Sequence, residues 1–151
     1  MSLKNIIARG VVALSDAAKK MQTVQVRLLA NETKDGLEHF EPYGYTARPQ
    51  PGAEAVVLFV EGDRSHGVCI AVADRRYRLQ ALEEGEVALY DDLGQTIRLG
   101  RNGIYIEGQA VTVTDCNVTV TGGDVIADGI SLKNHHHGGV QTGGGTTGSP
   151  I

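Results

Sequence analysis

The chain has 151 residues, of which 41% are hydrophobic and only 5% aromatic, so it can form one ordinary domain or two small ones but hardly a large conventional core. The formal net charge of −4 is spread along the chain and the basic clusters are short, which argues against nucleic acid as the main partner. Twenty glycines against four prolines indicate many tight turns and a bias toward β-structure.

The N-terminal residues do not combine a basic start, an apolar run and a small-residue cleavage site, so we expect no signal peptide. No apolar run approaches the ~20 residues that a membrane-spanning helix needs. Two cysteines, Cys69 and Cys116, are too few for a disulfide framework. We therefore expect two reduced thiols and assembly in a reducing cytoplasm.

Residues 1–80 mix short apolar runs with polar turns. Four runs have the length of a strand and are bounded by Gly, Pro, Asp or Asn, at residues 10–14, 23–29, 53–60 and 67–73. This pattern predicts a small antiparallel β-domain, with an OB-fold-like five-stranded barrel as the best candidate. Residues 15–21 are expected to form one or two helical turns, and the proline-rich residues 40–52 a loop. Nothing in this part suggests a catalytic arrangement.

Residues 81–96 are an acidic junction, with a short strand expected at residues 86–90. From residue 97 to residue 134, apolar residues recur every seven positions in two series. The first series is Ile97, Ile104, Val111, Val118, Val125 and Leu132, and the second is Leu99, Ile106, Val113, Val120 and Ala127. The series lie two residues apart, which puts both on one side of an extended strand, whereas a coiled coil needs spacings of three and four. The repeat therefore predicts short β-rungs joined by four-residue turns.

A rung of about three residues cannot bury its apolar pair alone, so other chains must supply the packing partner. If three copies wind about a common axis, the two series fill a narrow core and neighbouring chains pair the strand edges. We therefore predict an all-β homotrimer whose shaft, residues 97–134, is an intertwined triple-stranded β-helix. A monomeric solenoid and a disordered linker are the alternative interpretations.

The last segment, residues 135–151, is rich in glycine and begins with three histidines. In an extended chain His135 and His137 face the same way and His136 faces the opposite way. On a threefold axis, two histidines from each chain would supply six nitrogens, which suit an octahedral metal such as Fe(II) better than Zn(II). We predict a metal ion at the tip of the trimer, bound by His135 and His137 and lost in acid, because imidazole must be neutral to ligate. The alternative is a solvated turn that binds metal weakly.

Three elements carry a resemblance to a known family. They are Gly85-Glu86-Val87-Ala88-Leu89-Tyr90-Asp91, then Ile97-Arg98-Leu99 with Gly103-Ile104, and the ending His135-His136-His137-Gly138-Gly139 through Gly143-Gly144-Gly145-Thr146-Thr147-Gly148. In these elements, and over nearly its whole length, the sequence resembles the central spike, or baseplate assembly protein V, of Mu-like contractile-tailed bacteriophages.

This resemblance implies an N-terminal OB-fold domain, a trimeric β-helix and an apex where an HxH motif from each chain binds one iron ion. Here the motif falls on His135 and His137. The resemblance also implies a location in the tail baseplate of the virion, contact with the baseplate hub and other baseplate proteins, and piercing of the host outer membrane when the sheath contracts. Further ions, such as calcium or chloride, could lie on the threefold axis.

The sequence is also compatible in part with other functions. The same spike could form the tip of a contractile secretion or bacteriocin machine. A receptor-binding fibre would need varied side chains at its tip, but residues 138–151 contain no aromatic residue. A cupin-like oxygenase would need an acidic ligand downstream of the histidines, and no Asp or Glu follows Asp128. We therefore expect no catalytic residues and no enzymatic activity.

Overall fold

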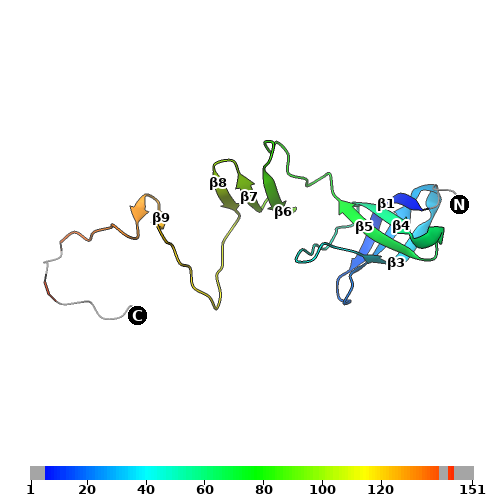
Figure 1. Ribbon diagram of the computed structural model, residues 1–151, viewed down its shortest axis with the longest axis horizontal. Coiled ribbons are helices and arrows are strands. Elements are labelled where there is room, and N and C mark those ends of the chain that lie inside the picture. The colour runs from blue at the N-terminus through cyan, green and yellow to red at the C-terminus, as the bar shows by residue number, and fades with distance from the viewer. Residues whose placement is uncertain (1–5, 140–142, 145–151) are drawn as a thin grey trace. The chain divides into compact units, whose positions relative to one another are not determined.

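The computed structural model describes residues 6–139 and 143–144, and their regular secondary structure is almost entirely β-strand (Figure 1). Within the described residues the helices are single 3-10 turns, η2 (Leu29–Asn31) and η3 (Val60–Gly62). In the described part of the chain no helix combines the length and apolar character needed to cross a membrane. The chain divides into two compact units, residues 1–109 and residues 110–151.

Five strands of the first unit close into a barrel, which confirms the predicted five-stranded barrel (Figure 1). They are β1 (Ile7–Asp16), β2 (Thr23–Leu28), β3 (Thr33–His39), β4 (Glu54–Phe59) and β5 (Gly67–Ala73). Their order around the barrel is β1-β2-β3-β5-β4, and β1 pairs with β4 to close it. All pairings are antiparallel except that of β3 with β5. The ten-residue β1 serves two neighbours, with an irregularity in its pairing to β2 between Val12 and Leu14.

The barrel core is small and mostly aliphatic, as the low aromatic content predicts. It consists of Val12, Val24, Val26, Leu28, Leu37, Ala53, Ala55, Val57, Phe59 and Cys69. Alternate residues of β4 are buried, because a strand with one face on a core buries every second side chain. Burial raises the pKa of the Cys69 thiol to about 11, so this thiol is unreactive at neutral pH. Both cysteines are free, as predicted, although Cys116 is exposed.

Two local predictions need correction. Residues 15–21 are not helical, because Ser15 and Asp16 end β1 and a bend follows in which the Asp16 carboxylate accepts a hydrogen bond from the backbone N–H of Ala18, at 3.0 Å. Strand β3 was not among the predicted runs. Its Asp35-Gly36 pair looks like a turn, and only its pairing with β2 and β5 buries Leu37 and His39. The predicted loop at residues 40–52 is confirmed.

An ionic cluster covers one side of the core residue Phe59. The Arg64 guanidinium lies 4.4 Å from the centre of the Phe59 ring and donates to both carboxylate oxygens of Glu32. Lys34 Nζ lies 3.0 Å from Glu32 Oε1. Hydrogen bonds from Arg64, and then from Lys34, lower the pKa of Glu32 from its ordinary 4.5 to about 2. The folded state therefore holds the charged carboxylate more strongly than the unfolded state does.

We expect Glu32→Gln to destabilise the barrel at neutral pH. Because the folded pKa is depressed, the contribution of Glu32 is complete above about pH 4.5 and disappears as the pH falls toward about 2. The difference in unfolding free energy between wild type and variant should therefore shrink over this range, as measured by urea unfolding. Glu38→Gln, an exposed carboxylate on β3, controls for net charge. A difference that stays constant down to pH 2 would contradict this role.

A second, three-stranded antiparallel sheet follows the barrel in the chain, in the order β6-β7-β8. Its strands are β6 (Val87–Tyr90), β7 (Thr96–Gly100) and β8 (Gly103–Glu107), and β6 confirms the strand predicted at residues 86–90. After residues 108–125, which are in neither helix nor strand, β9 (Ile126–Ala127) and β10 (Ile130–Ser131) form a hairpin. The predicted domain limits at residues 80, 96 and 134 stay predictions.

Candidate functional site

One face of the β6-β7-β8 sheet consists of aliphatic side chains that the described part of the chain leaves largely exposed. The register places Val87, Leu99 and Ile104 in one row across the sheet and Leu89, Ile97 and Ile106 in the next. Between 45% and 68% of the surface of each residue is exposed. We call these six residues the apolar face. A continuous apolar surface of this kind is unfavourable in water and typically marks an interaction site.

The sequence predicted four of these six residues through the seven-residue repeat. It missed Val87 and Leu89, which were assigned to the acidic junction. The available signal was the alternation Val87-Ala88-Leu89, which puts two aliphatic side chains on one side of a strand. The apolar face thus begins one strand earlier than the repeat.

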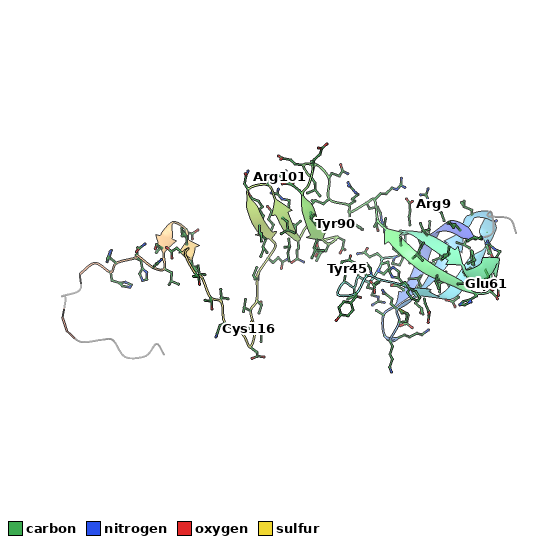
Figure 2. The ribbon with its side chains drawn as sticks, viewed as in Figure 1. Arg9, Tyr45, Glu61, Tyr90, Arg101 and Cys116 are labelled. Atoms are coloured by element: carbon green, nitrogen blue, oxygen red, sulfur yellow. The ribbon has the colours of Figure 1, made fainter. Side chains whose placement is uncertain are left out.

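On the opposite face of the same sheet, charged and aromatic side chains of the chain contact one another. Glu86 Oε1 accepts hydrogen bonds from Arg98 Nη1, at 3.0 Å, and from the backbone N–H of Arg101, at 3.2 Å. Figure 2 shows Arg101 at the turn between β7 and β8. The Arg98 guanidinium lies 4.4 Å from the centre of the Tyr105 ring. Hydrogen bonding from the backbone N–H of Glu83, then of Arg101, together with the positive charge of Arg98, lowers the pKa of Glu86.

The rest of the two apolar series is also exposed. Val111, Val113, Val118, Val120, Val125 and Leu132 each expose between 45% and 70% of their surface, and Ala127 is exposed as well. Every member of both series therefore meets solvent when the chain is alone. A repeat of aliphatic residues that stays unburied in the single chain is the expected property of a surface buried by other copies.

Two of the three histidines, His135 and His137, have their rings close together, and their role as metal ligands stays a prediction. The His135 and His137 rings lie 5.1 Å apart, centre to centre, and meet edge to face. His135 Nδ1 lies 3.0 Å from the Ser131 carbonyl oxygen and 3.1 Å from that of Leu132. Because a carbonyl oxygen can only accept, Nδ1 carries a hydrogen in this contact, and in the neutral ring the lone pair is then on Nε2. His135 therefore presents Nε2 as the nitrogen that can ligate a metal.

One chain does not supply a complete metal site. Among residues 6–139 and 143–144, no three His, Cys, Asp or Glu side chains are grouped so that they could hold an ion. Two imidazoles per chain are too few for a closed site, since structural metal sites use four or more protein ligands. The donor set fits a metal only if other copies contribute their own histidines.

A carboxylate that the sequence analysis passed over organises the chain just before these histidines. Asp124 Oδ1 accepts hydrogen bonds from the backbone N–H groups of Val125, at 2.8 Å, and Lys133, at 3.1 Å. Asp124 Oδ2 accepts from the Ser131 hydroxyl, and this hydrogen bond lowers the pKa of Asp124. The Ser131 oxygen in turn accepts from the backbone N–H of Asn134, at 2.8 Å. We call these contacts the Asp124 bracket.

Comparison with known proteins gives two family matches. Residues 9–76 match the family described as Bacteriophage Mu Gp45, N-terminal, and residues 129–150 match the GpV Apex motif. Similar proteins include the baseplate puncturing device gp45 of Escherichia phage Mu, 35% identical over 138 residues that cover 85% of this chain and 70% of that protein. Another is the Mu-like prophage FluMu protein gp45 of Haemophilus influenzae, 32% identical over 160 residues that cover 89% of this chain and 87% of that protein. The first family match covers most of the barrel, and the second begins at the β9–β10 turn and includes the three histidines.

Proposed function

This chain belongs to the family of the phage Mu baseplate protein gp45, and from that membership we propose that it is the trimeric central spike of a contractile phage tail. Phage baseplate components associate with other baseplate proteins, and the virion baseplate is the location that the family supports. The further proposal is that sheath contraction drives the spike through the host outer membrane. The Mu relative is described as a baseplate puncturing device, which supports this role.

The observation that carries the proposal is the exposure of both apolar series in the single chain. Three copies wound about one axis would bury the apolar face and the later residues of the repeat, such as Val118 and Val120, in a common core. The chains of such a shaft cannot separate without unthreading, so the assembly should resist unfolding kinetically. A narrow shaft of this kind transmits force along its axis, while the sheath supplies the force.

The barrel provides the wide base of the proposed spike. Its strand order β1-β2-β3-β5-β4, with one parallel pairing between β3 and β5, supports the OB-fold-like assignment. The barrel would make the contacts with the baseplate hub. No catalytic role is proposed for any residue, because the relatives named above are baseplate components and the chain offers surfaces for assembly.

At the tip, His135 and His137 of three chains would hold one iron ion with six imidazole nitrogens. The paired rings and the free Nε2 of His135 fit this role. The ion would fasten the three chain ends together where the mechanical load is greatest. Since only neutral imidazole ligates, acid should release the ion. Calcium or chloride ions could bind on the threefold axis of the shaft, in addition to the iron ion at the tip.

A contractile secretion or bacteriocin machine could use the same kind of tip. The relatives found belong to a phage and a prophage, and they favour the virion. The receptor-binding fibre and the cupin-like enzyme have no support from the described geometry, and neither is proposed.

The proposal is tested by native mass spectrometry combined with elemental analysis of untagged protein. We expect a mass of three chains with one iron ion, because both the shaft and the tip need threefold symmetry. A metal-free trimer would support the proposed shaft and contradict the proposed metal site at the tip. A monomer would reject the shaft and leave only the barrel assignment.

A further inference from the structure

The hairpin formed by β9 and β10 brings Asp124 close to the segment that leads into the histidines. Its turn is Asp128-Gly129, with φ of 49° and 83°, which is the conformation of a two-residue hairpin turn. The hairpin is prolonged by a hydrogen bond from the backbone N–H of Leu132 to the Val125 carbonyl, at 2.9 Å. Asp124 lies eleven residues before His135 in the chain, yet its carboxylate binds the backbone N–H of Lys133.

The Asp124 bracket engages both groups that hold the His135 ring, Ser131 through its hydroxyl and the Leu132 carbonyl through the N–H of the same peptide group, that of Lys133. Asp124 binds the Ser131 side chain, and the Ser131 and Leu132 carbonyls receive the Nδ1 hydrogen of His135. The Ser131 carbonyl also accepts the backbone N–H of His135, at 3.1 Å. A continuous series of hydrogen bonds therefore leads from the Asp124 carboxylate to the Ser131 hydroxyl, and from the Ser131 carbonyl to the His135 imidazole.

We propose that Asp124, through Ser131, is a positioning residue that fixes the Nδ1-protonated tautomer and the ring orientation of His135, so that Nε2 points to the metal. This inference rests on the proposed metal tip. A metal-binding histidine commonly has its second ring nitrogen held by an oxygen, and the partners behind the ligand set both orientation and affinity. Here the carbonyls of Ser131 and Leu132 are the direct partners, and Asp124 holds them in place.

A carboxylate suits this position because every hydrogen bond that it makes in the bracket is one that it accepts. Backbone N–H groups reach Oδ1 and a hydroxyl reaches Oδ2. An asparagine keeps the shape but replaces one acceptor oxygen with an NH2 donor. In place of Oδ2, that NH2 donor would face the hydroxyl oxygen Oγ of Ser131, which already accepts a hydrogen bond from the backbone N–H of Asn134. The Ser131 hydroxyl hydrogen would then lose its acceptor.

The test compares Asp124→Asn and Ser131→Ala with a matched control, Asp115→Asn. Asp115 is exposed, belongs to the same unit, and has a φ of 55° that asparagine tolerates. Trimers stripped of metal are titrated with Fe(II) under anaerobic conditions. We expect both bracket variants to weaken Fe(II) binding by about 10-fold, the lower end of the range for partners behind a ligand, because the carbonyls that hold His135 remain but lose their support; the control should bind like wild type.

The second readout is the tautomer of His135 in the metal-free trimer, observed by long-range proton–nitrogen correlation NMR. We expect Nδ1 to carry the hydrogen in wild type and Asp115→Asn, and a mixture of tautomers in Asp124→Asn and Ser131→Ala. Weaker binding with an unchanged tautomer would make the bracket merely structural and overturn the inference. Unchanged binding would overturn it as well. A wild-type trimer that binds no Fe(II) would instead reject the proposed tip, whatever the variants do.

Discussion

Leu99→Asp is expected to convert the trimer into a monomer while the barrel stays folded. Leu99 lies at the middle of one row of the apolar face, between Val87 and Ile104. In a threefold assembly the substitution would bury three carboxylates around one axis without partners. An uncompensated buried charge costs about 3 to 5 kcal/mol, so each chain should lose on the order of 100-fold or more in association. Native mass spectrometry and light scattering measure the loss directly.

Leu29→Asp is the matched control for this substitution. Leu29 is also an exposed leucine, with 80% of its surface accessible, but it lies in η2 of the barrel, outside the apolar face. In a monomer both leucines would tolerate aspartate about equally. Only a face covered by other copies makes Leu99 far more sensitive than Leu29, and a trimeric Leu99→Asp protein would contradict the assembly proposed here.

The barrel was predictable because most of its strands carry their own pattern. Val24, Val26 and Leu28 alternate along β2, and the structure buries all three. The strand β3 could not be predicted in the same way, since its exposed residues and its Asp-Gly pair resemble a turn. Leu37 and His39 are buried only because β3 pairs with the preceding strand β2 on one side and with β5, which is distant in sequence, on the other. Local patterns thus identified the strands that need least help from tertiary pairing.

The candidate site also has a part that the sequence could predict and a part that it could not. A strict repeat of aliphatic residues identified most of the apolar face, because spacing alone determines which side of a strand a residue occupies. The role of Asp124 could not be read from spacing. It depends on a hairpin whose turn at Asp128-Gly129 was interpreted as a link between rungs, and on a hydroxyl seven residues away. Hydrogen bonds that cross a turn become visible only when the turn is known.

His135→Ala combined with His137→Ala should take the iron content of the trimer from one ion to none and leave the trimer intact. The two rings supply all the imidazole nitrogens of the proposed site, so their removal leaves no ligand at the tip. The apolar series that would hold the chains together lie elsewhere, from Ile97 to Leu132, and are untouched. Elemental analysis of the trimer fraction measures the metal, and native mass spectrometry measures the assembly.

His136→Ala is the natural control, because the middle histidine points away from an extended pair and should not ligate. It removes one imidazole from the same three-residue segment, so it separates loss of a ligand from loss of any histidine. Iron retained by His136→Ala and lost by the double variant would assign the site to His135 and His137. If the double variant were monomeric, the tip rather than the shaft would hold the chains together, and the apolar face would need another occupant.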